Sequence, residues 1–168
     1  KLFKTVRSVA FAVQLQGDNS WQEPTSRKVL LRDSGGSKKY RGALSLNHIF
    51  ELPLQKHTEL RDSLLDGLNT QVTLLLLDTS STLDTRVLGT VKSDLRKMVD
   101  ERLDKEKEEI ELVDSAGSKI GRVQVDFGVV KAVRALQVTG AAVGADSKLQ
   151  KEAISVSVER VDLQSGVE

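Results

Sequence analysis

The chain has 168 residues, a length typical of one domain or of one domain with an appendage. Its formal net charge of +1 gives the whole molecule no strong attraction to nucleic acid or to an anionic membrane, so such binding requires a local patch. The chain has no Cys, which excludes disulfides, thiolate metal sites and cysteine catalysis, and which fits a reducing, cytoplasmic location. Because aromatic residues are only 4% of the chain, we expect a core made mostly of Val and Leu.

Alternating and continuous apolar runs predict the strands. Residues 4–16 alternate, with Val9, Phe11 and Val13 on one face, and a period of two is typical of a half-buried strand. The unbroken apolar run at 72–77 is about one strand long and predicts burial on both faces. By the same criteria, other strands are expected at 27–32, at 44–54 (two strands or one long bent strand), at 86–92, at 111–113 and at 122–130.

The pattern changes to a helical period in the segment 94–109. Leu95, Met98, Val99 and Leu103 form a narrow apolar stripe, and Ser93 or Asp94 is a suitable N-cap. The sequence therefore predicts one inserted amphipathic helix over about 94–109. One or two further helical turns are expected at 57–68.

These elements predict an all-β protein, an eight-stranded antiparallel β-sandwich spanning residues 1–132. Residues 133–168 are expected to form a small-residue linker and an extra strand near 154–163. That strand is predicted to be an edge strand of this sandwich or the start of a following domain. Since an apolar strand left in solvent favours aggregation, we expect it to dock within the chain or on a second copy, giving a homo-oligomer.

The order of these segments resembles the C2 domain family, an antiparallel sandwich that docks on membranes or proteins through loops at one end. Over roughly residues 4–130, the order and spacing of six pieces carry the resemblance: those at 8–15, 27–32, 47–52, 74–78, 87–89 and 121–127. NHIFEL at 47–52 is similar to the family's N-E-x-F-x-F strand, with His48 in place of Glu and Leu52 in place of the second aromatic. LLLLD at 74–78 resembles the strand that leads into a calcium loop, and VLG at 87–89 resembles the family's F-I-G.

The acidic residues depart from the calcium-binding members of that family. Calcium takes six to eight oxygen ligands, several of them carboxylates. The corresponding loops here offer only Asp18, Asp78 and Asp84, and Ser80 stands where a second Asp is expected. We therefore expect no metal and no cofactor, with calcium-dependent lipid binding as the less favoured alternative.

The resemblance implies a lipid site at the basic residues Arg27, Lys28, Lys38, Lys39 and Arg41. In the family, this region forms a basic groove that meets phosphoinositide head groups. Basic residues close to an anionic membrane surface each contribute about 1 kcal/mol. The competing interpretation is a solvated hairpin edge, in which Lys prevents pairing with other strands.

Trp21 and Leu83 are the candidate apolar contacts with the membrane. If the sandwich is right, both lie in loops at the same end, and Trp prefers the membrane interface. The competing interpretation is that Trp21 folds back as a cap on the core.

Nothing in the sequence predicts an enzyme. The turn Asp33-Ser34-Gly35-Gly36 is similar to the nucleophile segment of trypsin-like proteases, but both histidines, His48 and His57, follow it in the chain rather than precede it. We expect a non-enzymatic recruitment module that binds an anionic membrane without calcium. The alternative is a protein-interaction domain of a larger scaffold, cytoskeletal or ciliary.

Overall fold

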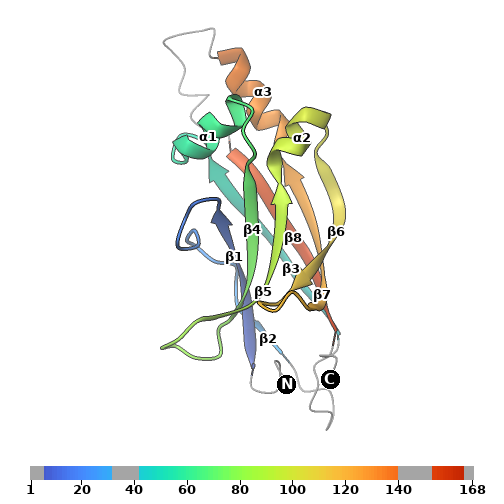
Figure 1. Ribbon diagram of the computed structural model, residues 1–168. Coiled ribbons are helices and arrows are strands. Elements are labelled where there is room, and N and C mark those ends of the chain that lie inside the picture. Colours follow the sequence, from blue (N-terminus) through green and yellow to red (C-terminus); the bar gives the residue numbers. More distant parts are fainter. Residues whose placement is uncertain (1–5, 32–41, 140–152, 165–168) are drawn as a thin grey trace.

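The computed structural model describes residues 6–31, 42–139 and 153–164, except for the side chains of 137–139. This part of the chain folds into eight strands and three short helices (Figure 1). The strands are β1 (Ser8–Leu15), β2 (Val29–Leu30), β3 (Gly42–Pro53), β4 (Gln71–Asp78), β5 (Arg86–Asp94), β6 (Lys105–Val113), β7 (Lys119–Gly128) and β8 (Ala153–Leu163). The helices are α1 (Thr58–Leu65), α2 (Leu95–Glu101) and α3 (Val130–Thr139).

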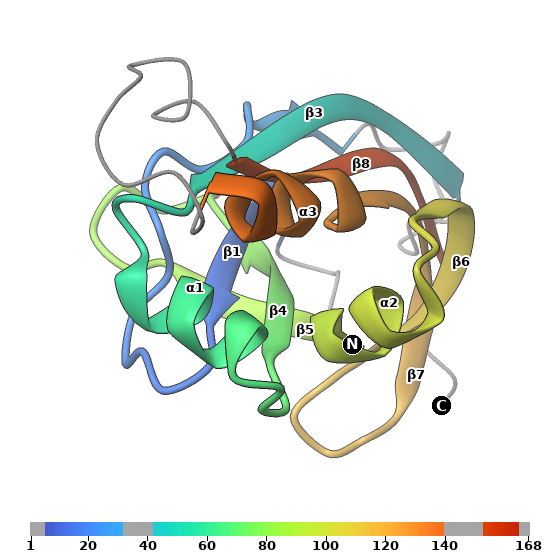
Figure 2. The ribbon, with the colours of Figure 1, turned by 90° about the horizontal axis from the view of Figure 1, so that it is seen from above.

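All strand pairs are antiparallel, and the strands follow the order β2-β1-β4-β5-β6-β7-β8-β3 in one curled sheet. Between β5 and β6 the register holds a single residue pair, Thr90 with Val113. The sheet therefore consists of two four-stranded halves that curve around a shared interior, nearly as a barrel (Figure 2). The predicted all-β class with eight antiparallel strands is confirmed, although the eighth strand is β8 rather than a strand within residues 1–132.

Strands β1 and β4 form the centre of one half and are buried on both faces. Val9, Phe11 and Val13 point into the main core, as their alternation predicts, and are completely buried. Alternate residues of the run in β4 face the other way, where Leu75 and Leu77 pack with Ala12 of β1. Burial on both faces explains why this run shows no polar alternation.

The segment 44–54 forms one long strand rather than two. β3 extends over 12 residues and bends at a register shift between Ser45 and His48, where Asn47 has a positive φ of 46°. Asn tolerates this left-handed conformation better than most residues. Of the two predicted alternatives, the single bent strand is the one observed.

The predicted helix over 94–109 is wrong in its second half. Asp94 does cap α2, since its side chain accepts a hydrogen bond from the backbone N–H of Arg96. The helix ends at Glu101, because Arg102 adopts a left-handed conformation, and the charged residues from Lys105 onward pair with β7 as strand β6. Cross-strand pairing here outweighs the helical propensity of Glu and Lys.

β8 lies inside the sheet and pairs with β7 on one side and β3 on the other. The prediction that it docks within the chain is confirmed, and the prediction that it is an edge strand is wrong. Its residues Ile154, Val156 and Val158 are completely buried in the core shared with residues 8–128. The last strand in sequence is therefore part of the same sheet, which local pattern alone does not reveal.

The three helices lie together at one end of the curled sheet (Figure 2). Leu64 of α1, Met98 of α2 and Val133 of α3 close the interior there. We call this region, α1 to α3 with the residues that directly follow α1 and α2, the helical end. No helix of the described ranges is both long and apolar enough to cross a membrane.

Candidate functional site

The predicted basic cluster is only partly within the described residues. Lys38, Lys39 and Arg41 lie outside them. Arg27 and Lys28 are exposed and precede β2, at one margin of the sheet. Arg27 reaches across to the other margin, where Nη2 donates to the backbone oxygen of Ser45 in β3 at 3.5 Å. This contact crosses the seam between the two outermost strands, so Arg27 has a role within the fold.

The pKa of His48, which lies at the same seam, is shifted from its usual value. Its ring lies edge-on to Phe50, with ring centroids 4.6 Å apart. Burial of the imidazole, followed by the positive charge of Arg27, holds the pKa of His48 below its usual value of 6.5. His48 is therefore favoured in its neutral form beside a cation.

Trp21 and Leu83 are not brought together. The residues that follow β1 lie beside the start of β4, because Leu15 pairs with Val72, whereas the 79–85 loop follows the other end of β4. Trp21 packs against Ala12, Leu75 and Leu77 on the outer face of the sheet, as the cap interpretation predicts, although over a second cluster rather than the main core. Leu83, in contrast to Trp21, is 96% exposed in its loop.

The three weak metal candidates are also separated. Asp18 follows β1 and Asp78 ends β4, and the paired stretch between these positions runs over six residue steps, or roughly 20 Å at 3.3 Å per step. Among the described residues, no group of three or more potential ligands could hold a metal ion.

Asp78 instead organises its own loop. It accepts a hydrogen bond from the backbone N–H of Ser80 at 3.0 Å and one from Arg86 at 3.0 Å. Partial burial alone raises the pKa of Asp78, but the hydrogen bonds from Ser80 and Arg86 outweigh it and hold the pKa below its usual value. The carboxylate is thus tied to an Arg at the position where a calcium loop would need it free.

A hollow of about 780 Å³ between the β1–β2 connection and α1 contains Asp18, His57 and Ser63. These are the residue types of a hydrolytic triad. No hydrogen bond joins any two of them, however, whereas a serine nucleophile needs a base within hydrogen-bond reach. The hollow therefore lacks the contacts of a nucleophilic site, and Ser34 lies outside the described residues.

The helical end carries exposed leucines that sequence reasoning missed. Leu65, Leu68 and Leu103 are 42%, 56% and 61% exposed. They belong to or follow helices whose buried residues are Leu60 and Leu64 in α1 and Leu95 and Met98 in α2. The apolar positions at 60, 64, 65 and 68 make a stripe too wide for the single buried face of α1. That excess width was the available sequence signal.

Beside these leucines, a cleft of about 480 Å³ opens between the helices. Its lining includes three arginines, Arg96, Arg102 and Arg134, and one acid, Asp100. Arg96 pairs with Asp100 and donates through Nη1 to the backbone oxygen of Leu64 at 2.9 Å. Since this pair is internally neutral, Arg102 and Arg134 give the cleft an excess of positive charge.

Comparison of the chain with family models, curated proteins and solved structures found no match. The resemblance to C2 domains therefore stays a prediction, and the residues themselves carry the functional argument.

Proposed function

We propose that this chain is a non-enzymatic, peripheral recruitment module that attaches to anionic membranes, without calcium, through its helical end. The observation that carries the proposal is the exposure of Leu65, Leu68 and Leu103 on the same end as an arginine-lined cleft. The proposed membrane site is therefore a surface formed by three helices and differs from the site that the sequence predicts.

The chemistry of this surface fits a membrane interface. Exposed leucines enter the boundary between head groups and acyl chains, while arginine heads stay at the level of the phosphates. Full burial of a Leu side chain is worth about 1.5–3 kcal/mol, and each basic residue near an anionic surface adds about 1 kcal/mol. If three leucines insert partly into the membrane and two arginines contact its phosphates, the summed free energy is sufficient for reversible binding.

Two further points support the proposal. The pair of four-stranded halves is the type of arrangement that the resemblance to C2 domains implies, and that family docks on membranes through one end. Anionic lipids are concentrated in the cytoplasmic leaflet, which fits a chain without Cys. We therefore place the proposed attachment on the cytoplasmic side.

The test is co-sedimentation with phosphatidylserine-containing and neutral vesicles, with calcium and with a chelator. We expect binding to the anionic vesicles that is independent of calcium and that falls as salt rises. Leu68→Ser and Leu103→Ser are each expected to weaken binding roughly tenfold, because each removes apolar area from the interface.

Matched controls exist at the opposite end. Leu83→Ser removes a leucine that is more exposed than those of the helical end, and Arg7→Gln removes an exposed arginine. Both variants are expected to bind as the parent chain does. Trp21 emission is expected to stay unshifted, since the ring packs on the sheet. Equal loss of binding in Leu83→Ser and Leu103→Ser, or no binding at low salt, would contradict the proposal.

A second candidate function, binding of a protein partner within a scaffold, is favoured by the weak joint between β5 and β6. An exposed sheet edge is what an extended peptide needs in order to bind as an added strand. The groove reaches α2 of the helical end, but its lining contains none of the exposed leucines, so variants of the two sets of residues separate the two functions.

A further inference from the structure

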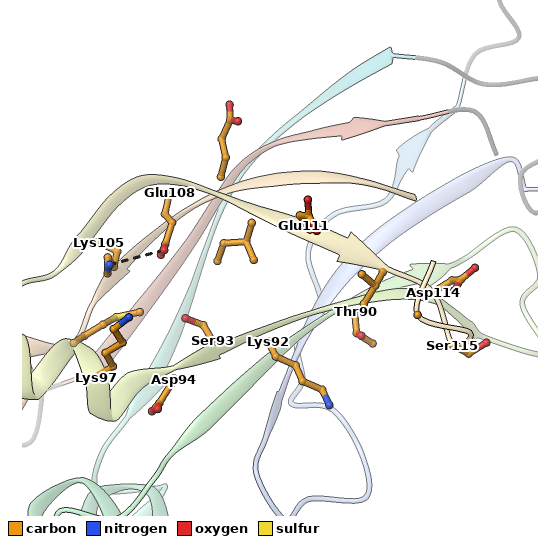
Figure 3. A pocket seen from close by; sticks show the side chains of 15 residues that line it. Thr90, Lys92, Ser93, Asp94, Lys97, Lys105, Glu108, Glu111, Asp114 and Ser115 are labelled. Atoms are coloured by element: carbon orange, nitrogen blue, oxygen red, sulfur yellow. Dashed lines mark ion pairs between the residues drawn. The ribbon is translucent and has the colours of Figure 1, made fainter. Parts of the chain in front are cut away.

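The joint between β5 and β6 has fewer residue pairs than any other joint between neighbouring strands of the sheet. On its far side, β5 pairs with β4 along its whole length, from Arg86 to Asp94, and β6 pairs with β7 from Lys105 to Val113. On the facing sides the register holds only the pair Thr90–Val113. Beyond this joint the strands separate into a groove of about 780 Å³ that reaches Met98 of α2 (Figure 3).

Each strand therefore presents an open edge to the groove. In an antiparallel strand, alternate residues direct N–H and C=O groups to opposite sides, so an unpaired side can accept another strand. On β6, a register shift lies between Lys105 and Glu108, and the backbone N–H of Lys107 bonds to the side chain of Asp126. The regular part of this open edge is thus the short stretch Glu109–Leu112.

The charge of the groove selects the partner. Its lining has five carboxylates and three lysines, a formal excess of two negative charges. The acids are Asp94, Glu108, Glu109, Glu111 and Asp114, and the lysines are Lys92, Lys97 and Lys105. Lys97 and Lys105 lie toward α2 together with Asp94 and Glu108, whereas Glu111 and Asp114 lie toward the joint, where Lys92 is the labelled lysine near Thr90 (Figure 3). The joint end is therefore the more acidic one.

Three of the lining carboxylates already take part in ion pairs at the surface. Glu108 lies 3.9 Å from Lys105, Glu109 lies 3.6 Å from Arg122, and Glu111 lies 2.7 Å from Lys119. Such pairs at the surface are worth about 0–1 kcal/mol, so a cation from a partner can replace or join them. Ile110, which is partly buried and packs on the core, adds an apolar contact within the same stretch.

We propose that this groove binds an extended segment of a partner protein in which apolar and basic residues alternate, added as a strand along Glu109–Leu112. Backbone hydrogen bonds supply the pairing, and alternate side chains of the guest face either the carboxylates or Ile110 and Met98. The inference is independent of membrane attachment, because it uses neither the leucines nor the arginines of the helical end.

The experiment is an NMR titration of the ¹⁵N-labelled full chain with three short peptides. The first alternates Val and Lys, the second alternates Val and Glu, and the third is the first with N-methyl groups on every other amide. We expect only the first to shift the amides of Ser93, Ile110 and Leu112, and to bind at least about tenfold more tightly than the acidic peptide. The N-methylated peptide is expected to lose binding, because it cannot donate along one edge.

Two protein variants distinguish the groove from general surface charge. Glu111→Gln removes a lining carboxylate, and Glu106→Gln removes an exposed carboxylate of the same strand that does not line the groove. We expect severalfold weaker binding for Glu111→Gln and unchanged binding for Glu106→Gln, with equal melting temperatures as the check on folding.

Several results would overturn the proposal. They are equal affinity for the basic and acidic peptides, full binding of the N-methylated peptide, equal effects of the two variants, or no shift at millimolar peptide. Concentration-dependent shifts of the same amides without peptide would show that a second copy fills the groove. Absence of vesicle binding by the parent chain at low salt, together with intact peptide binding, would refute the membrane proposal and leave this inference standing alone.

Discussion

At the scale of single residues, the tightest constraint is at Gly121 in β7. A Cβ atom there would collide with the backbone oxygen of Asp162 in β8, and β8 is held on both sides by other strands. Gly128, near the other end of β7, is also crowded, but its neighbour is the hydroxyl of Ser155, which can rotate away. Crowding by backbone and crowding by a side chain therefore have different consequences.

We expect Gly121→Ala to lower the free energy of unfolding by about 1–3 kcal/mol, the usual cost of overpacking, and Gly128→Ala to cost clearly less. Urea denaturation of the two variants beside the parent chain measures the difference. Equal stabilities of the two variants would show that β7 and β8 are not packed as closely as described.

A second prediction concerns the pKa of His48 at the seam between the margins of the sheet. Arg27→Gln removes the cation beside His48 and is expected to raise the pKa of His48 toward 6.5, while Lys28→Gln leaves it unchanged. Proton NMR of the imidazole follows both titrations. A His48 pKa that is identical in the parent chain and in Arg27→Gln would show that Arg27 does not lie close to His48 of β3 in solution.

The lowered pKa of His48 also determines in which direction the free energy of unfolding changes with pH. Since the folded state holds the pKa below its unfolded value, the neutral ring stabilises the fold above about pH 6.5, and this contribution is lost as pH falls through the folded pKa. The free energy of unfolding should therefore fall on acidification from pH 7, and less steeply in Arg27→Gln.

At the scale of elements, α3 depends on a residue far away in the chain. Asp104, between α2 and β6, accepts hydrogen bonds at 2.8 Å from the backbone N–H groups of both Val129 and Val130, where α3 begins. These N–H groups have no partner inside a helix, and the carboxylate also complements the positive end of the helix dipole. One side chain thus links the end of α2 to the start of α3.

We expect Asp104→Ala to destabilise the fold by about 1 kcal/mol, the typical cost of removing a helix cap, and Asp104→Asn to cost less because its amide oxygen still accepts. Thermal and urea denaturation test this order. Lys131→Ala, an exposed change on α3 itself, is the control and should have little effect. Equal stabilities for all three variants would show that Asp104 does not stabilise the fold as a cap of α3.

At the scale of the whole molecule, the separation of the acids predicts how the fold responds to calcium. Asp18 lies at the helical end of β1, whereas Asp78 and Asp84 lie at the opposite end of β4. A ligand that binds only the folded state raises the melting temperature, so calcium in the millimolar range is expected to leave it unchanged. Melting curves with calcium and with chelator decide this, and a calcium-dependent rise that Asp78→Asn abolishes would restore a metal site.

The sequence by itself determined the elements whose signal is local. The apolar run at 72–77 and the cap at one of the two predicted positions, Asp94, match the structure, because side-chain period and capping act over a few residues. The alternation at 4–16 located strand β1 but predicted it half-buried, whereas Ala10 and Ala12 on its other face are also completely buried. The all-β class followed from counting such segments. Where two local preferences competed, as in the charged segment from Lys105 onward, pairing with β7 decided for the strand.

Only the tertiary structure decided where these elements meet. β8 enters between β7 and β3 from the far end of the chain, and the joint of β5 and β6 is reduced to Thr90–Val113. The candidate site follows the same rule, since Arg96 and Arg134 stand far apart in sequence and line one cleft only when three helices pack together. Strand order and helix packing are set by the burial of one shared core, a property of the whole chain that no short window contains.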